Sequence, residues 1–303
     1  MIKPSVGGPP PSDGREPPVM VRPLTPADIP DLNLAHHPRL QGGEAEALVV
    51  QSPGLSQWIP ETGEFALVAP WRHRQELPWI HTLWGFRHDA ELVAAVVAAA
   101  EQQGRDGVIY MDAFESRRPS FYEINGLELL ESIVTYELSQ PYRLLGTMDG
   151  YRQRFLPVRR DVSERWDALL ELDHAAFPWL WWNSAEEFAA YARMPNVELW
   201  VGLERQEVVS YIGITHYHGW GHLDRIATHP DRQGQGFGRE ALHYAVRRLV
   251  DRGARRVGLS TQGDNARSRR LYESVGFRET PAHHYGVYGV VFASGRTRLA
   301  QGG

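Results

Sequence analysis

The sequence of 303 residues contains no cysteine. This absence excludes disulfide bridges, thiolate zinc sites and a cysteine nucleophile. The sequence also has no apolar run long enough to span a membrane, and its first residues lack the apolar core of a signal peptide. We therefore expect a cytoplasmic protein that does not bind membranes.

An excess of positive charge is also missing, since the formal net charge is −5. That balance argues against a general nucleic-acid binder. A metal site is not expected either, because the pairs His36-His37 and His283-His284 alternate faces on a strand and have no carboxylate at ligand spacing. The chain does contain 42% hydrophobic residues, enough for ordinary cores, in a length typical of two domains.

Three glycines lie within five positions in the run Gln233-Gly234-Gln235-Gly236-Phe237-Gly238, between a predicted strand and a helix that begins at Arg239. Glycines let the backbone turn tightly, so that free N–H groups at the start of a helix can point at an anion. The same pattern is typical of an ordinary strand-to-helix turn. Alone, it indicates either a phosphate-binding loop or a simple turn.

The flanking residues favour the phosphate-binding loop. Gln233-x-x-Gly236-x-Gly238, preceded by His229-Pro230, resembles the acyl-CoA pyrophosphate loop of the GNAT superfamily of N-acyltransferases. Downstream, Asn265-x-x-Ser268-x-x-Leu271-Tyr272-Glu273-x-x-Gly276-Phe277 resembles the second motif of that family, in the same order and at the usual distance. In this half the resemblance covers roughly residues 155–292.

The resemblance implies a set of residues that bind acetyl-CoA or another acyl-CoA as cosubstrate, with no metal. They are Ile226, Ala227, Thr228, Gln233, Gly234, Gln235, Gly236, Phe237, Gly238, Arg239, Asn265 and Ser268. Asn265 either contacts the cosubstrate or caps the following helix. Thr228 departs from the family, which usually has Val at this position, and places a hydroxyl close to the thioester.

The resemblance also implies catalytic positions. GNAT enzymes often carry their base four and six residues before the end of the strand that precedes the loop, which here gives Asp224 and His222. The two side chains point to the same face, because successive side chains on a strand alternate between faces. Each residue is either a catalytic base or an ordinary surface residue. Tyr272 resembles the family tyrosine beside the thioester sulfur, which either protonates the leaving thiolate or packs against the CoA arm.

The chain repeats part of itself. Phe121-Tyr122-Glu123-Ile124-Asn125-Gly126-Leu127-Glu128 aligns with the run from Leu271 to Arg278 at an offset of 150. In place of the glycine run, the first copy has His81 to Arg87, with one glycine and bulky side chains. The resemblance therefore extends to tandem GNAT proteins whose first half is degenerate, and Tyr122 is expected to be structural.

These patterns predict a mixed α/β fold of two tandem GNAT-like domains, each a central, mostly antiparallel sheet flanked by helices. Residues 1–18 are expected to form a disordered tail, 19–142 the degenerate domain, 143–153 a linker and 154–303 the catalytic domain. Within them, we expect residues 36–60 to be rich in loops, the terminal strand at about 285–292 to close the sheet, and 294–303 to be a frayed end.

Four large aromatic residues lie within the six positions from Phe177 to Trp182. In GNAT folds this region commonly borders the acceptor site. The rings either form a wall for the acceptor, or pack between the domains or into the core.

The resulting prediction is an acyl-CoA-dependent N-acyltransferase that moves an acetyl or similar group to an amine of a small molecule or peptide by direct attack. No serine elbow is visible, and no covalent enzyme intermediate is expected. A non-catalytic acyl-CoA-binding regulator and a mycothiol-synthase-like enzyme are the alternatives. The acceptor, the acyl-chain preference and the choice between monomer and homodimer stay open.

Overall fold

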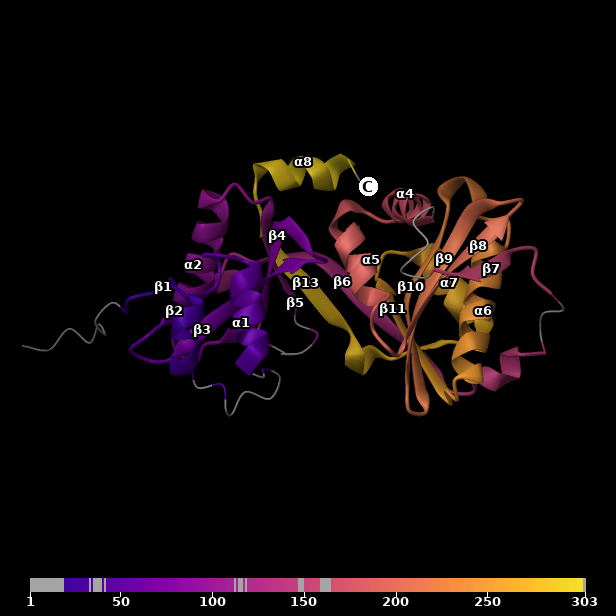
Figure 1. The fold of residues 1–303 in the computed structure, drawn as a ribbon, viewed down its shortest axis with the longest axis horizontal. Coiled ribbons are helices and arrows are strands. Elements are labelled where there is room, and N and C mark those ends of the chain that lie inside the picture. The colour runs from indigo at the N-terminus through magenta and orange to yellow at the C-terminus, as the bar shows by residue number, and fades with distance from the viewer. Residues whose placement is uncertain are drawn as a thin grey trace, which may run out of the picture.

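A computed structural model describes residues 19–32, 34, 40, 42–111, 113, 117, 119–146, 150–158 and 165–301. The predicted tail and the pair His36-His37 lie outside the described residues. The chain forms two α/β halves that lie side by side and share one sheet (Figure 1). The predicted mixed α/β class is confirmed, although the two expected sheets are continuous with each other.

The sheet has thirteen strands in the order β1-β2-β3-β4-β5-β13-β6-β11-β10-β9-β8-β7, with β12 paired to β6. The strands are β1 (Arg22–Pro23), β2 (Gln57–Ile59), β3 (Glu64–Trp71), β4 (Arg74–Trp84), β5 (Gly107–Met111), β6 (Glu128–Leu138), β7 (Arg154–Pro157), β8 (Val197–Glu204), β9 (Glu207–Tyr217), β10 (Trp220–Thr228), β11 (Arg256–Gln262), β12 (Arg278–Glu279) and β13 (Tyr285–Val291). The pairs β4–β5 and β10–β11 are parallel, and the other pairs along the sheet are antiparallel.

The helices lie against this sheet. They are η1 (Pro26–Asp31), α1 (Gly42–Gln51), α2 (Asp89–Gln102), α3 (Pro119–Ile124), η3 (Pro141–Leu144), α4 (Trp166–Ala176), η5 (Trp179–Trp181), α5 (Ala185–Tyr191), η6 (Pro230–Arg232), α6 (Phe237–Asp251), α7 (Ala266–Val275), η7 (Pro281–His283) and α8 (Ala293–Gln301). Among those that the structure describes, none is long and apolar enough to cross a membrane.

The halves exchange a strand. β6 comes from residues assigned to the first predicted domain, yet it pairs with β11 of the second. β13, the terminal strand, lies between β5 and β6 instead of closing the second sheet at its edge. The expectation for the terminal strand was therefore wrong, because hydrophobic alternation identifies a strand without its neighbour.

The repeat in the sequence corresponds to matched elements. α2 and α6 are equivalent helices that present apolar side chains at helical spacing, with Leu92, Val93 and Val96 buried in one and Leu242, Val246 and Leu249 in the other. α3 and α7 are both followed within two residues by a glycine with left-handed backbone, Gly126 at φ 64° and Gly276 at φ 102°.

Two helices were missed by the sequence patterns. Residues 36–60 contain α1 and β2 instead of loops alone, and α1 buries Ala45, Leu48 and Val49 at helical spacing. The residues expected to be a frayed end form α8, which lies between the two halves in Figure 1. Its Leu299 packs against a core cluster that contains residues of both halves. Leu299 is the one large apolar residue of α8, and the glycine pair at Gly42-Gly43 hides the start of α1.

Candidate active site

The glycine run forms the turn between η6 and α6. Gly234 and Gly236 have φ of 76° and 93°, a left-handed backbone that residues with a side chain rarely adopt. A Cβ atom at Gly238 would lie 3.2 Å from the Thr228 hydroxyl oxygen. The first two glycines are therefore required by backbone conformation and the third by close approach of the preceding strand.

This turn leaves a row of free amides. Within the described part of the chain, the backbone N–H groups of residues 234–239 have no acceptor, because they precede or begin α6. The start of a fifteen-residue helix also carries partial positive charge. The loop is thus suited to bind an anion such as a pyrophosphate.

Side chains hold the loop in place from both sides. The Gln233 side chain donates to the Thr228 carbonyl at 3.2 Å. Arg152, from the predicted linker, donates to the Gln235 carbonyl at 2.5 Å, pairs with Glu240 at 2.8 Å and covers the Phe237 ring. The sequence patterns missed Arg152, since its partners are more than eighty positions away.

A cavity of about 910 Å³ opens over the loop and ends at α7. The predicted residues that line it are Ile226, Ala227, Thr228, Gln233, Gly234, Gly236, Gly238, Arg239, Asn265, Ser268 and Tyr272. Gln235 and Phe237 do not line it: the Gln235 side chain donates to the Asp231 carbonyl, and Phe237 is buried under the loop. The Arg239 side chain also donates to the Ser274 hydroxyl.

The cavity exists because β10 and β11 separate. Their parallel pairing stops at Leu223 and Leu259. The register between β10 and β9 shifts between Leu223 and Arg225, so that Asp224 is the extra residue of a β-bulge. A bulge re-aims its side chain, and here it turns Asp224 toward the opening.

Tyr272 lies where the large cavity meets a smaller one of about 130 Å³. Asn265 caps α7 by accepting from the Ser268 N–H at 3.0 Å, which fixes the helix that carries Tyr272. The ring is 4% exposed. Burial raises the pKa of Tyr272 to about 12, although its hydrogen bond with Ser268 acts in the opposite direction, so the phenol is protonated at neutral pH.

Asp224 is held by three side chains. Its carboxylate accepts from the Tyr191 hydroxyl at 2.5 Å and the Thr215 hydroxyl at 2.6 Å, and it contacts His222 Nδ1 at 2.7 Å. The predicted pair of His222 and Asp224 is therefore in contact, but only Asp224 lines a cavity, with His222 beside it. Tyr191 and Thr215 carried no local signal in the sequence.

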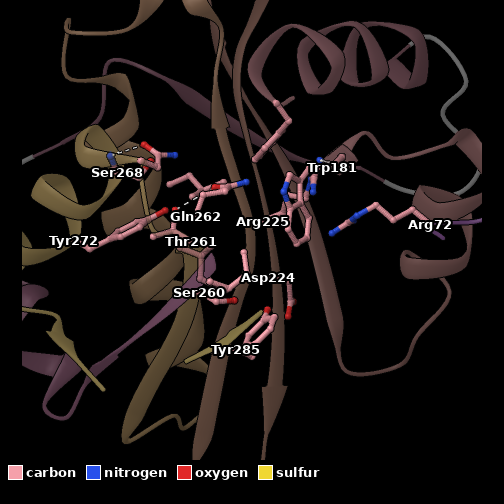
Figure 2. Close-up of a pocket in the computed structure, with 15 residues that line it drawn as sticks. Arg72, Trp181, Asp224, Arg225, Ser260, Thr261, Gln262, Ser268, Tyr272 and Tyr285 are labelled. Carbon is pink, nitrogen blue, oxygen red and sulfur yellow. Dashed lines mark hydrogen bonds between the residues drawn. The ribbon is translucent and has the colours of Figure 1, made fainter. Parts of the chain in front are cut away.

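The smaller cavity contains residues from both halves (Figure 2). Arg72, in the turn between β3 and β4, faces it from the first half, and Trp181, Asp224, Arg225 and Tyr272 face it from the second. The sequence patterns missed Arg72, because they placed the site within one half.

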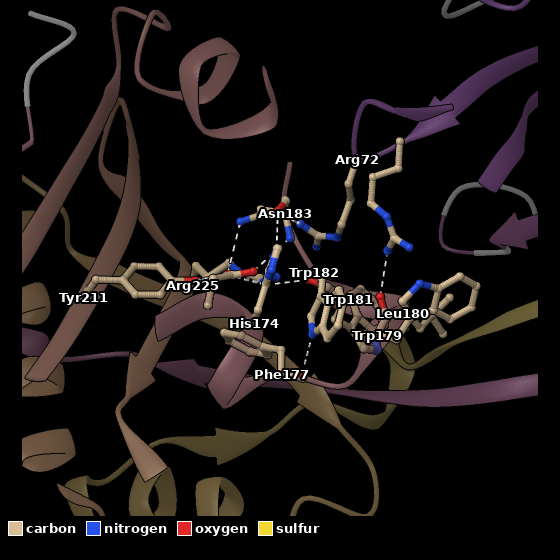
Figure 3. A network of polar contacts seen from close by, with 12 residues as sticks. Arg72, His174, Phe177, Trp179, Leu180, Trp181, Trp182, Asn183, Tyr211 and Arg225 are labelled. Carbon is tan, nitrogen blue, oxygen red and sulfur yellow. Dashed lines mark hydrogen bonds and ion pairs between the residues drawn. The ribbon is translucent and has the colours of Figure 1, made fainter. Parts of the chain in front are cut away.

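The aromatic cluster lies partly at the junction of the halves and partly along the cavities. Trp179 and Leu180 are buried at the junction of the halves, where the Trp71 indole donates to the Leu180 carbonyl at 2.7 Å and Arg74 donates to the Trp179 carbonyl at 2.6 Å (Figure 3). Phe177 and Trp181 line the cavities. The cluster thus packs the interface and also supplies part of the site.

The equivalent place in the first half is filled by the protein itself. The buried Glu64 carboxylate accepts from the backbone N–H groups of Arg87 and His88, at 3.2 and 3.0 Å, at the start of α2. The Tyr122 ring stacks on Tyr288 with centroids 3.7 Å apart. An internal carboxylate thus sits at the helix start where the second half has free amides.

Comparison with known proteins identifies a domain in the second half. Residues 166–277 match the model of the Acetyltransferase (GNAT) family. Mycothiol acetyltransferase of Beutenbergia cavernae is 40% identical over 70 residues, 23% of each chain. The ribosomal-protein-bS18-alanine N-acetyltransferase of Escherichia coli K12 is 42% identical over 57 residues, 19% of this chain and 38% of the other. The chain therefore spans about a quarter to two fifths of the length of these curated relatives.

Solved structures resemble the chain over nearly its whole length. A GCN5-related N-acetyltransferase from Sphaerobacter thermophilus has a TM-score of 0.55 and 15% identity, covering 89% of this chain and 94% of its own. A tandem GNAT protein from the clavulanic acid biosynthesis pathway has a TM-score of 0.57 and 11% identity, covering 90% and 98%. Residues 166–277 are thus a GNAT acetyltransferase domain, and the chain as a whole has the fold of a tandem GNAT protein.

Proposed function

We propose that the chain transfers an acetyl or similar acyl group from CoA to an amine, and that the second half performs the reaction. The observation that supports this most directly is the cavity that joins the free amides of the glycine loop to Tyr272. Its volume of about 910 Å³ lies at the upper end of the range for ligand pockets, which suits an elongated cosubstrate.

The residues present fit an acyl-CoA. The amides of residues 234–239 would bind the pyrophosphate, with the Arg239 side chain at the rim of the cavity. The unpaired edges of β10 and β11 beyond Leu223 leave backbone groups for the amides of the pantetheine arm. Bound there, the cosubstrate supplies an activated acyl group as a thioester.

The reaction requires that the acceptor nitrogen lose protons, that it attack the thioester carbon, and that the leaving thiolate gain a proton. The acceptor nitrogen gives one proton to Asp224. The proton then passes to solvent through His222, which contacts Asp224. The nitrogen then attacks the thioester carbon, and a C–N bond forms as the C–S bond breaks. The nitrogen loses its second proton to solvent, while Tyr272 protonates the leaving thiolate and recovers a proton from solvent.

The first half is proposed to bind no CoA. The Glu64 carboxylate already accepts the helix-start amides, and a pyrophosphate at that place would meet a buried negative charge. Its contribution is to complete the smaller cavity with Arg72.

The test is turnover of acetyl-CoA with a panel of amines, followed by release of free thiol and by the mass of the acetylated amine. Wild type should acetylate at least one amine, and Tyr272→Phe should lower kcat by about 10²-fold while acetyl-CoA binds as before. Binding of CoA with no turnover across the panel would instead support a non-catalytic regulator.

A further inference from the structure

Arg72 is an unpaired cation at the smaller cavity. Its Nη1 donates to the amide oxygen of Asn183 at 2.5 Å, and no carboxylate of the described residues lies within ion-pair distance. Its Nε is buried and has no hydrogen-bond partner in the part of the chain that the structure describes. A partly buried cation without a counter-ion loses part of its hydration, which is costly unless a ligand supplies the opposite charge.

The surroundings of Arg72 add to the cost of leaving its charge without a counter-ion. The guanidinium lies beside the Trp71 and Trp181 rings, with its carbon 5.7 and 5.3 Å from their centroids. Burial lowers the pKa of Arg72 to about 10, and the nearby positive charge of Arg225 adds to the effect, while the charges of Glu187 and Asp173 oppose it only in part. An anion bound beside Arg72 would offset both the loss of hydration and the repulsion from Arg225, and would stabilise the charged guanidinium.

Arg225, the other arginine of the cavity, is already neutralised. It pairs with the fully buried Asp173 at 2.6 Å and donates to the Trp181 carbonyl at 2.5 Å (Figure 3). Its guanidinium also covers the Phe177 ring at 3.8 Å. The positive charge that is free to meet a ligand is therefore that of Arg72.

The cavity is thus lined by a cation without an ion pair among the described residues, Arg72, and by a carboxylate, Asp224. Figure 2 shows Tyr272 and Arg72 on opposite sides of the cavity with Asp224 between them. An ammonium near Asp224 would be placed beside the thioester end of the large cavity, and an anionic group on the same molecule would extend toward Arg72. The volume of about 130 Å³ fits a small anionic group better than a phosphate ester with its substituent.

We propose that the acceptor is a small amine that carries a carboxylate, such as a free amino acid, and that Arg72 binds this carboxylate. The planar guanidinium matches a carboxylate by geometry as well as by charge. The first half of the chain thereby determines acceptor specificity for a reaction that the second half performs. This inference rests on the proposed acyl transfer.

The experiment compares amino acids with their carboxamides as acceptors at saturating acetyl-CoA. Wild type should have a KM about 10- to 100-fold lower for the acids, the range of a charge-assisted hydrogen bond. Arg72→Gln should abolish that preference, and Arg72→Lys should retain part of it, because the charge remains without the planar fork. The comparison between variants cancels the difference in basicity between an acid and its amide.

His73→Gln is the matched control, since His73 lies in the same turn, is exposed and pairs with Glu187 outside the cavity. CoA affinity and melting temperature of each variant report on folding. Equal KM values for acids and amides in wild type, or a preference that Arg72→Gln leaves intact, would overturn the inference while the acyl transfer stands. Absence of turnover on every amine would overturn the proposed function and this inference with it.

Discussion

Tyr122 and Tyr272 occupy matching places in α3 and α7, yet their rings face different surroundings. Each is buried, and each carbonyl accepts from the N–H group five residues ahead, Leu127 at 2.9 Å and Phe277 at 3.1 Å. The Tyr122 ring stacks on Tyr288, whereas the Tyr272 ring lines two cavities. The repeat therefore preserves the scaffold in both halves, but only the tyrosine of the second half lines the cavities of the candidate site.

Gly236→Asp should abolish CoA binding. The substitution adds a side chain where φ is 93° and places a negative charge among the amides proposed to bind phosphate. Gly219→Asp is the matched control, because Gly219 has φ of 76° in a turn with open space around it. Calorimetric titration should show CoA binding lost in the first variant and kept in the second; unchanged affinity in Gly236→Asp would refute the loop assignment.

Arg152→Ala should weaken CoA binding roughly five- to tenfold, because it removes one hydrogen bond that holds the loop at Gln235. The nearby Arg154, whose side chain bonds to Gln206 away from the loop, gives the control Arg154→Ala. The Arg152–Glu240 pair is half exposed on the arginine side, so the melting temperature should change little. Equal CoA affinities for the two variants would show that Arg152 does not hold the loop in its binding conformation.

Asp224→Asn should lower kcat/KM for the amine by about 10²- to 10⁴-fold, the usual contribution of a general base. CoA affinity should stay unchanged, since Asp224 lines the smaller cavity and not the large one. His222→Gln should cause a smaller loss, because His222 lies beside Asp224 and outside the cavities. Asp251→Asn on the exposed side of α6 is the control, and a larger effect for His222 than for Asp224 would reverse their roles.

Tyr272 should make the protein sensitive to alkali. Burial raises its pKa from the usual 10 to about 12, so its ring is protonated in both folded and unfolded chains below about pH 10. Between about pH 10 and pH 12 the unfolded chain ionises first, and up to ~3 kcal/mol of folding stability is lost as the pH rises.

Tyr272→Phe lacks this contribution. Urea unfolding at about pH 9 and about pH 11 should therefore show the variant losing less stability than wild type across the interval. The other tyrosines are common to both proteins and cancel in the comparison. Parallel losses in the two proteins would show that the phenol is not protected by burial.

The local patterns of the sequence predicted much of the scaffold. The strand-glycine-helix order from Trp220 to Asp251 and the cap at Asn265 depend on neighbouring residues, so they were readable from one segment. The placement of Tyr272 followed from the family motif, and the structure brings it to the cavity. The domain ranges, the base and the set of cosubstrate contacts stay predictions.

What the sequence did not predict depends on contacts between distant segments. Arg72 meets Asn183 over 111 positions, and Tyr191 meets Asp224 over 33. The strand exchange between β6 and β13 is also invisible locally, because each strand has an ordinary apolar alternation and its partner is set by tertiary packing.

The number of CoA molecules bound per chain tests the central claim most directly. The free amides at residues 234–239 and the Glu64 carboxylate at the start of α2 together predict one site. Calorimetric titration or native mass spectrometry of the wild-type chain should give one CoA per chain, lost in Gly236→Asp. Two bound molecules, or one that persists in Gly236→Asp, would contradict the assignment of the cosubstrate to the second half.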